Sequence, residues 1–170
     1  LNSIEDENTI RELIEAFPTT GKSELFINFI EKELQPYINS NYKVTDKKYI
    51  IGQSLGGLLA SEILLKKPVL FTNYTITSPS TWRDKQTRIT NESRELSNQK
   101  NLKLNVYLAV GKEGSVMEND AKDFARIIQS VDKKNINFHF EYFPKENHAT
   151  ILHNSIYKAF LLEFPYKEPK

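Results

Sequence analysis

The segment Gly52-Gln53-Ser54-Leu55-Gly56 constrains this chain more than any other part of its sequence. It follows the apolar run Tyr49-Ile50-Ile51 directly, and a helical arrangement of apolar residues begins at once behind it. In a strand–turn–helix setting, G-x-S-x-G is typical of the nucleophile elbow, a turn so tight that the neighbours of the serine must be small. We therefore expect Ser54 to stand exposed between a strand and a helix. The alternative is a glycine-rich turn in which Ser54 only caps the helix.

Composition narrows the class of protein. With 170 residues, 39% of them hydrophobic, the chain has the core of one domain, so we expect a single domain over residues 1–170. The net charge of +1 gives no electrostatic reason to expect nucleic acid or an anionic membrane as partner. No stretch reaches the ~20 apolar residues of a membrane span, and no signal peptide is evident. A cytoplasmic, a periplasmic and a secreted location all fit these features.

Metal and cofactor chemistry finds no support in the sequence. The chain has no cysteine, which excludes disulfides and thiolate metal sites. We see no metal-ligand spacing, and no glycine-rich phosphate loop fits better than the elbow. We therefore expect no cofactor and no metal.

The hydrophobic pattern predicts an alternation of strands and helices. Runs of β-branched and aromatic residues predict strands at 48–51, 71–77, 104–110 and 136–143. Helical periodicity predicts helices at 10–17, 25–38 (bent or ended near Pro36), 55–67, within 88–96, at 117–131 and at 152–163. Such alternation favours βαβ units, and so a three-layer α/β/α fold around a mostly parallel sheet.

A serine hydroxyl needs a neighbouring base, and the chain has three histidines. His139 lies inside the last expected strand, where it should face a packed surface, and His153 lies within the final helix. His148 alone follows a strand in a loop, which is the place that the base of an α/β-hydrolase occupies. We expect His148 to be the base; the alternative is an exposed loop histidine or a helix cap.

Several carboxylates could complete a triad. Glu113 follows the strand at 104–110 by three residues, which suits an acid that reaches the histidine of the next loop. Glu118 and Asp120 lie near a helix start, where a favourable interaction with the helix N-terminus would also explain them. Asp84 follows the preceding strand. A Ser–His dyad without an acid stays open as well.

In such a site the expected roles follow from the residue types. His148 takes the Ser54 proton as the hydroxyl attacks an acyl carbon, the acid orients the imidazole, and the N–H of Leu55 donates to the oxyanion. A small-molecule ester would be the substrate. Gln53 and Trp82 are candidates for the substrate pocket, and Tyr74 could add an aromatic wall, although Trp82 and Tyr74 are types that more often pack in a core or at its rim.

Several segments in order carry a family resemblance. They are 29–38, Asn41-Tyr42, Gly52–Leu58, Ser78-Pro79-Ser80-Thr81-Trp82, Val110–Glu113 and Glu146–His148. Together they resemble the putative-esterase branch of the α/β-hydrolases, which includes esterase D-like enzymes and the ferric-siderophore esterases. The resemblance implies Ser54 as nucleophile, His148 as base and Glu113 as acid of a serine esterase. Gln53 replaces a histidine that is more usual there, and we expect little effect because this side chain should point away from the hydroxyl.

The chain is shorter than the members of this family. They carry a further half upstream, with the first strands of the sheet and a loop that supplies a second oxyanion N–H. The resemblance therefore implies a C-terminal portion or a truncated relative. We expect an unpaired edge on the strand at 48–51, pairing with another copy or with the missing half, and weak or no ester hydrolysis by the isolated chain. A binding protein without catalysis and an acyltransferase with the same triad are the alternatives.

Overall fold

The computed structural model describes residues 23–81, 96, 103–131, 136–166 and 168. The chain divides into two compact units, Leu1–Val44 and Thr45–Lys170. The expected helix at 10–17 lies outside the described residues, and so does the helix expected within 88–96, apart from Leu96.

In the first unit, helical structure continues past Pro36. An α-helix, α2 (Ser23–Phe29), leads into a π-helical segment, η1 (Ile30–Leu34), and then into α3 (Gln35–Asn41). Proline has no backbone N–H and cannot donate to the carbonyl four residues before it, and a π-helical turn accommodates such an interruption. Accordingly, the N–H of Gln35 bonds to the carbonyl of Ile30, five residues back. The expected bend or end near Pro36 is thus a local change of helix type.

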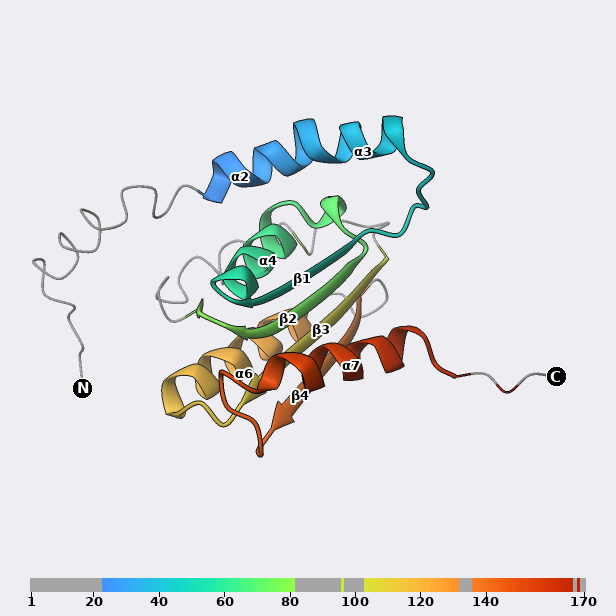
Figure 1. The fold of residues 1–170 in the computed structure, drawn as a ribbon. Coiled ribbons are helices and arrows are strands. Elements are labelled where there is room, and N and C mark those ends of the chain that lie inside the picture. The colour runs from blue at the N-terminus through green and yellow to red at the C-terminus, as the bar shows by residue number, and fades with distance from the viewer. Residues whose placement is uncertain (1–22, 82–95, 97–102, 132–135, 167, 169–170) are drawn as a thin grey trace, which may run out of the picture. The chain divides into compact units, whose positions relative to one another are not determined.

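The second unit is built on a parallel sheet (Figure 1). Among the described residues the sheet has four strands in the order β1-β2-β3-β4, and each neighbouring pair is parallel. The strands are β1 (Tyr49–Ser54), β2 (Asn73–Pro79), β3 (Leu104–Gly111) and β4 (Ile136–Phe143). Their order in space equals their order in the sequence, as successive right-handed βαβ crossovers produce. The expected α/β fold with a parallel sheet is confirmed.

Helices cover both faces of this sheet. They are α4 (Leu55–Lys66), α6 (Ser115–Ser130) and α7 (Ile151–Glu163), with a short 3₁₀-helix η2 (Pro68–Leu70) after α4. Helix α4 packs against β1 and β2, α6 chiefly against β3, and α7 against β2 and β3. Figure 1 shows α7 on the near side of the strands and α6 on the far side, which gives three layers.

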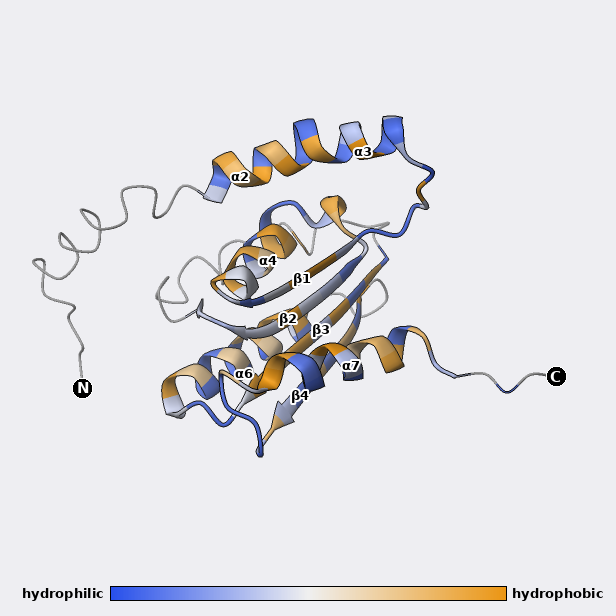
Figure 2. Ribbon diagram, in the orientation of Figure 1, coloured by the Kyte–Doolittle hydropathy of each residue, from blue (hydrophilic) through white to orange (hydrophobic). Residues whose placement is uncertain are grey.

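Strands β2 and β3 form the centre of the core because they are buried on both faces. Successive side chains of a strand point to opposite faces of the sheet. Tyr107 and Ala109 face α7, where Ile151 and Ala159 cover them. Figure 2 shows β3 and much of α4 as hydrophobic, as continuous burial requires. Since all four strands are parallel, the loops that follow them lie together beyond the carboxyl ends of the strands.

Strand β1 lies at one edge of the sheet. Within the described residues β2 is its only strand neighbour, and Ile51 in its middle is 41% exposed. In the described part of the chain, β1 thus has the unpaired edge that the sequence predicts. Among the described residues, no helix is both long enough and apolar enough to cross a bilayer.

Candidate active site

Ser54 occupies a strained turn between β1 and α4. It is the last residue of β1, and α4 begins at the next residue. Its backbone has φ 58° and ψ −118°, a region that costs a residue other than glycine about 1–3 kcal/mol. Its side chain makes no capping hydrogen bond to α4. The strain and the missing cap both favour a nucleophile elbow over a serine that only caps a helix.

The glycines on either side explain why the turn can close so tightly. A Cβ atom on Gly52 would lie 2.2 Å from the carbonyl oxygen of Gly56. One on Gly57 would lie 3.1 Å from the Cα of Pro79 at the end of β2. Gly56, in contrast, faces open space. The first glycine of G-x-S-x-G is therefore required sterically, whereas a side chain at Gly57 would be tight against the end of β2.

A pair of alanine substitutions tests this geometry. We expect Gly52→Ala to lower the free energy of unfolding by about 1–3 kcal/mol or more, because the new methyl group meets backbone that cannot move away freely. Gly56→Ala is the matched control, expected to be neutral or to stabilise α4 by up to about 1 kcal/mol. Urea unfolding followed by circular dichroism measures both. Equal effects of the two substitutions would contradict the tight packing at Gly52.

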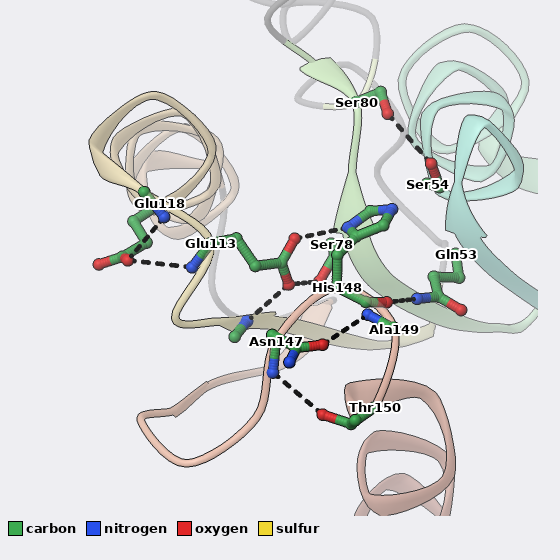
Figure 3. Close-up of polar contacts among 12 residues, drawn as sticks. Gln53, Ser54, Ser78, Ser80, Glu113, Glu118, Asn147, His148, Ala149 and Thr150 are labelled. Carbon is green, nitrogen blue, oxygen red and sulfur yellow. Dashed lines mark hydrogen bonds and ion pairs between the residues drawn. The ribbon is translucent and has the colours of Figure 1, made fainter.

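The structure brings Glu113 and His148 into direct contact (Figure 3). Glu113 lies in the loop after β3, and His148 lies in the loop between β4 and α7. Glu113 Oε2 lies 2.5 Å from His148 Nδ1. The glutamate side chain is 3% exposed, whereas the histidine side chain is 45% exposed. A buried carboxylate thus holds one ring nitrogen of a histidine that stays accessible to a substrate.

The second carboxylate oxygen of Glu113 is also bonded. Its Oε1 accepts hydrogen bonds from the hydroxyl of Ser78 and from the backbone N–H of Gly111, the latter at 3.1 Å. A buried carboxylate is stable only when its oxygens have such partners. With donors on both oxygens, the plane of the carboxylate is fixed relative to the imidazole.

The other acidic candidates have different surroundings. Glu118 lies in the first turn of α6, and its Oε1 accepts from the backbone N–H groups of Glu113 and Gly114, each at 3.2 Å. This is the stabilising role of an acid near a helix N-terminus, and it also supports the loop that carries Glu113. Asp120 lies within α6, and Asp84 lies outside the described residues.

The loop that carries His148 is fixed from several directions. Gln53 Nε2 donates to the carbonyl oxygen of His148 at 2.5 Å. Inside the loop, Asn147 Oδ1 accepts from the N–H of Ala149 at 2.9 Å, and Thr150 Oγ1 accepts from the N–H of Asn147 at 3.0 Å. Gln53, which the sequence suggests for the substrate pocket, is the residue before Ser54. Its side chain thus links the turn at Ser54 to the loop that carries His148.

The Ser54 hydroxyl itself bonds to Ser80, the residue that follows β2. Within the part of the chain that the structure describes, its hydrogen bond is to Ser80 Oγ, at 3.4 Å, and none joins it to His148. Figure 3 shows the imidazole directed from Glu113 toward the side where Ser54 and Ser80 stand. Hydrogen bonds between catalytic groups are often long in the absence of substrate and shorten only in the complex.

The other two histidines are placed elsewhere. His139 on β4 stacks on Tyr107, with ring centroids 5.5 Å apart, and its Nε2 lies 2.9 Å from Glu141 Oε2. We expected this side chain to face a packed surface, but 44% of it is exposed. His153 lies within α7, as expected.

Of the suggested aromatic wall, only Tyr74 is described. It is 1% exposed, and its hydroxyl donates to the carbonyl of Pro68 at 3.2 Å, so it belongs to the core and lines no pocket. Trp82 lies outside the described residues. Nor do the described residues contain a group of three histidine, aspartate or glutamate side chains placed to hold a metal ion.

Comparisons with known proteins identify a family. A family model described as "Putative esterase" matches residues 6–159. The ferri-bacillibactin esterase BesA of Bacillus subtilis (strain 168) is 32% identical over 143 residues, which are 80% of this chain and 50% of that protein.

Solved structures give the same result. A BES protein from Bacillus cereus has a TM-score of 0.77 at 32% identity, over 85% of this chain and 56% of its own. An IroE-like serine hydrolase from Shewanella oneidensis has a TM-score of 0.76 at 26% identity, over 85% of this chain and 48% of its own. The chain spans about half the length of these relatives.

Proposed function

The chain belongs to the esterase family whose model matches residues 6–159, and we propose that it is a serine hydrolase that cleaves carboxylic esters. One observation carries the proposal most directly. Oε2 of the buried Glu113 lies 2.5 Å from Nδ1 of the half-exposed His148. Gln53, the residue before Ser54, donates a hydrogen bond to the carbonyl oxygen of His148. A nucleophile on a strained turn, a base and an orienting acid are the three parts of a triad.

The proposed reaction has two half-reactions. Ser54 Oγ attacks the acyl carbon while His148 Nε2 takes the hydroxyl proton, and Glu113 stabilises the imidazolium that forms. The N–H of Leu55 lies at the start of α4, where backbone N–H groups have no intrahelical acceptor, and donates to the oxyanion. The alcohol leaves with the proton from His148. Water, deprotonated in turn by His148, then attacks the acyl-enzyme. The bond to Ser54 Oγ breaks, His148 returns the proton to this oxygen, and the acid is released.

The relatives suggest a class of substrate. The relative from Bacillus subtilis is named as a ferri-bacillibactin esterase. We propose that the ester bonds cleaved by this chain are those of siderophores.

A fluorophosphonate probe tests the proposal at the nucleophile, without depending on the fit of a substrate. We expect intact-mass measurement to show one covalent adduct per chain, and peptide mapping to place it on Ser54. Hydrolysis of ferri-bacillibactin, compared with p-nitrophenyl acetate, then tests the substrate class. Absence of any adduct on a folded chain would contradict the enzyme and favour a binding protein with the same fold.

Product analysis separates hydrolysis from acyl transfer. Both reactions pass through the same acyl-enzyme, so they differ only in the acceptor of the acyl group. We expect that adding an alcohol to the reaction leaves free acid as the main product. An ester of the added alcohol as the main product would identify an acyltransferase.

A further inference from the structure

We propose that Ser78 is a positioning residue of this site, which fixes the Glu113 carboxylate so that its Oε2 faces His148. The inference rests on the proposed function, because it assigns a residue that acts through the acid of the proposed triad. Ser78 would touch neither the substrate nor the reacting atoms. Its backbone, its burial and its contact each point to this role.

The backbone at Ser78 departs from regular strand geometry. Along β1 and β2, Gln53 pairs with Thr77, but the next pair is Ser54 with Pro79, so the register shifts and Ser78 has no partner on β1. Its φ is 44°, a value that residues with a side chain rarely adopt. Irregularities of this kind re-aim a side chain and are frequent next to active sites. Backbone strain at a non-glycine residue persists only where the surrounding structure enforces it, and such residues cluster at functional sites.

The side chain of Ser78 ends on the acid. Ser78 is fully buried, and its hydroxyl donates to Glu113 Oε1, the oxygen that does not contact His148. The other donor to this oxygen is the backbone N–H of Gly111, at 3.1 Å. Without the hydroxyl, one N–H alone would hold that end of a buried carboxylate, and the carboxylate could turn away from the imidazole.

Two substitutions separate the hydroxyl from the backbone. Ser78→Ala removes the hydrogen bond and keeps the strain, whereas Ser78→Gly removes the bond and relieves the strain. If Ser78 served only the shape of the strand end, the glycine variant would behave like the original chain or better. If the hydroxyl positions Glu113, both variants share one defect. Ser155→Ala is the matched control, because Ser155 is equally buried and its hydroxyl pairs with Thr77, at 2.6 Å, and not with Glu113.

The experiment follows two signals in each variant. The first is the low-field proton resonance of His148 Nδ1–H, assigned by its loss in His148→Ala, which reports the bond to Glu113 whether or not the chain turns over substrate. The second is the rate of fluorophosphonate labelling of Ser54. We expect both Ser78 variants to shift or broaden the resonance and to slow labelling by about 10-fold to 100-fold, the range for a lost hydrogen bond to a charged group. We expect Ser155→Ala to change neither signal.

Each other outcome has a definite meaning. An unchanged resonance in Ser78→Ala, or recovery of the original resonance and rate in Ser78→Gly alone, would overturn the proposal. The same holds if the unsubstituted chain shows no such resonance, because the Glu113–His148 pair would then be absent in solution. If no chain is labelled but the resonance responds as expected, the proposed function fails while the positioning role of Ser78 stands.

Discussion

Replacement of Ser54 by alanine is expected to abolish ester hydrolysis, with a fall in kcat of about 10⁶, the loss seen when the nucleophile of a triad is removed. The remaining groups, His148 and the N–H of Leu55, could still orient a water molecule or polarise a carbonyl, but no acyl-enzyme could form. Fluorophosphonate labelling should disappear together with hydrolysis. Steady-state kinetics with p-nitrophenyl acetate and intact-mass measurement check both expectations.

A glycine at the same position provides a sharper control. Ser54→Gly should be as inactive as Ser54→Ala but more stable by about 1 kcal/mol, because glycine adopts a positive φ without strain. Thermal unfolding compares the two variants. An alanine variant that keeps a tenth of the original activity would place the nucleophile at another residue. Equal stability of the two variants would mean that the turn at residue 54 is relaxed in solution.

Much of the fold could be predicted because its signals are local. The apolar run before Gly52 predicted β1, and the observed strand extends it to Ser54. The expected strand at 136–143 matches β4 residue for residue. Strands of this kind carry β-branched and aromatic residues in unbroken runs, and the alternation with helices then leaves few topologies. The alternation predicted a parallel sheet but not the strand order, which the pairing of the strands in the structure gives.

The candidate site was partly predictable for the same reason. His148 could be selected by elimination, since the other histidines lie within a strand and a helix. The choice of acid stayed open, because spacing alone does not say which carboxylate reaches the histidine. That depends on the register of β3 against β4, where Gly111 pairs with Phe143 and so brings their two loops together. The contact of Glu113 with His148 is a consequence of this pairing.

Contacts between distant segments escaped prediction. The sequence contains Ser78 in a Ser-Pro-Ser stretch, but nothing local shows that its hydroxyl reaches Glu113, 35 residues away along the chain. Gln53 was expected to have little effect, yet its amide reaches the carbonyl of His148 across 95 residues. Both contacts lie where β1 and β2 lose their regular register. An irregularity of this kind arises from pairing between strands, so neither strand reveals it alone.

Substitution of Glu113 by glutamine is expected to lower kcat by about 10⁴, although the two side chains have nearly the same shape. The structure determines which way the amide would lie. Ser78 and the N–H of Gly111 both donate to one oxygen of Glu113, so the glutamine oxygen should take that place and its NH₂ group should face His148 Nδ1. An NH₂ group there donates to Nδ1 and leaves the ring proton on Nε2. The imidazole would then be unable to accept the Ser54 proton.

Glu118→Gln is the matched control for this substitution. Glu118 Oε1 accepts from two backbone N–H groups, and a glutamine oxygen can accept the same two bonds, so we expect less than about a tenfold loss of kcat. Kinetics with p-nitrophenyl acetate and the low-field resonance of His148 measure both variants. The resonance should vanish in Glu113→Gln and persist in Glu118→Gln, since only the first substitution takes the proton from Nδ1. A Glu113→Gln variant with full activity and an intact resonance would show that Glu113 does not orient His148. That result would favour a Ser–His pair without this acid.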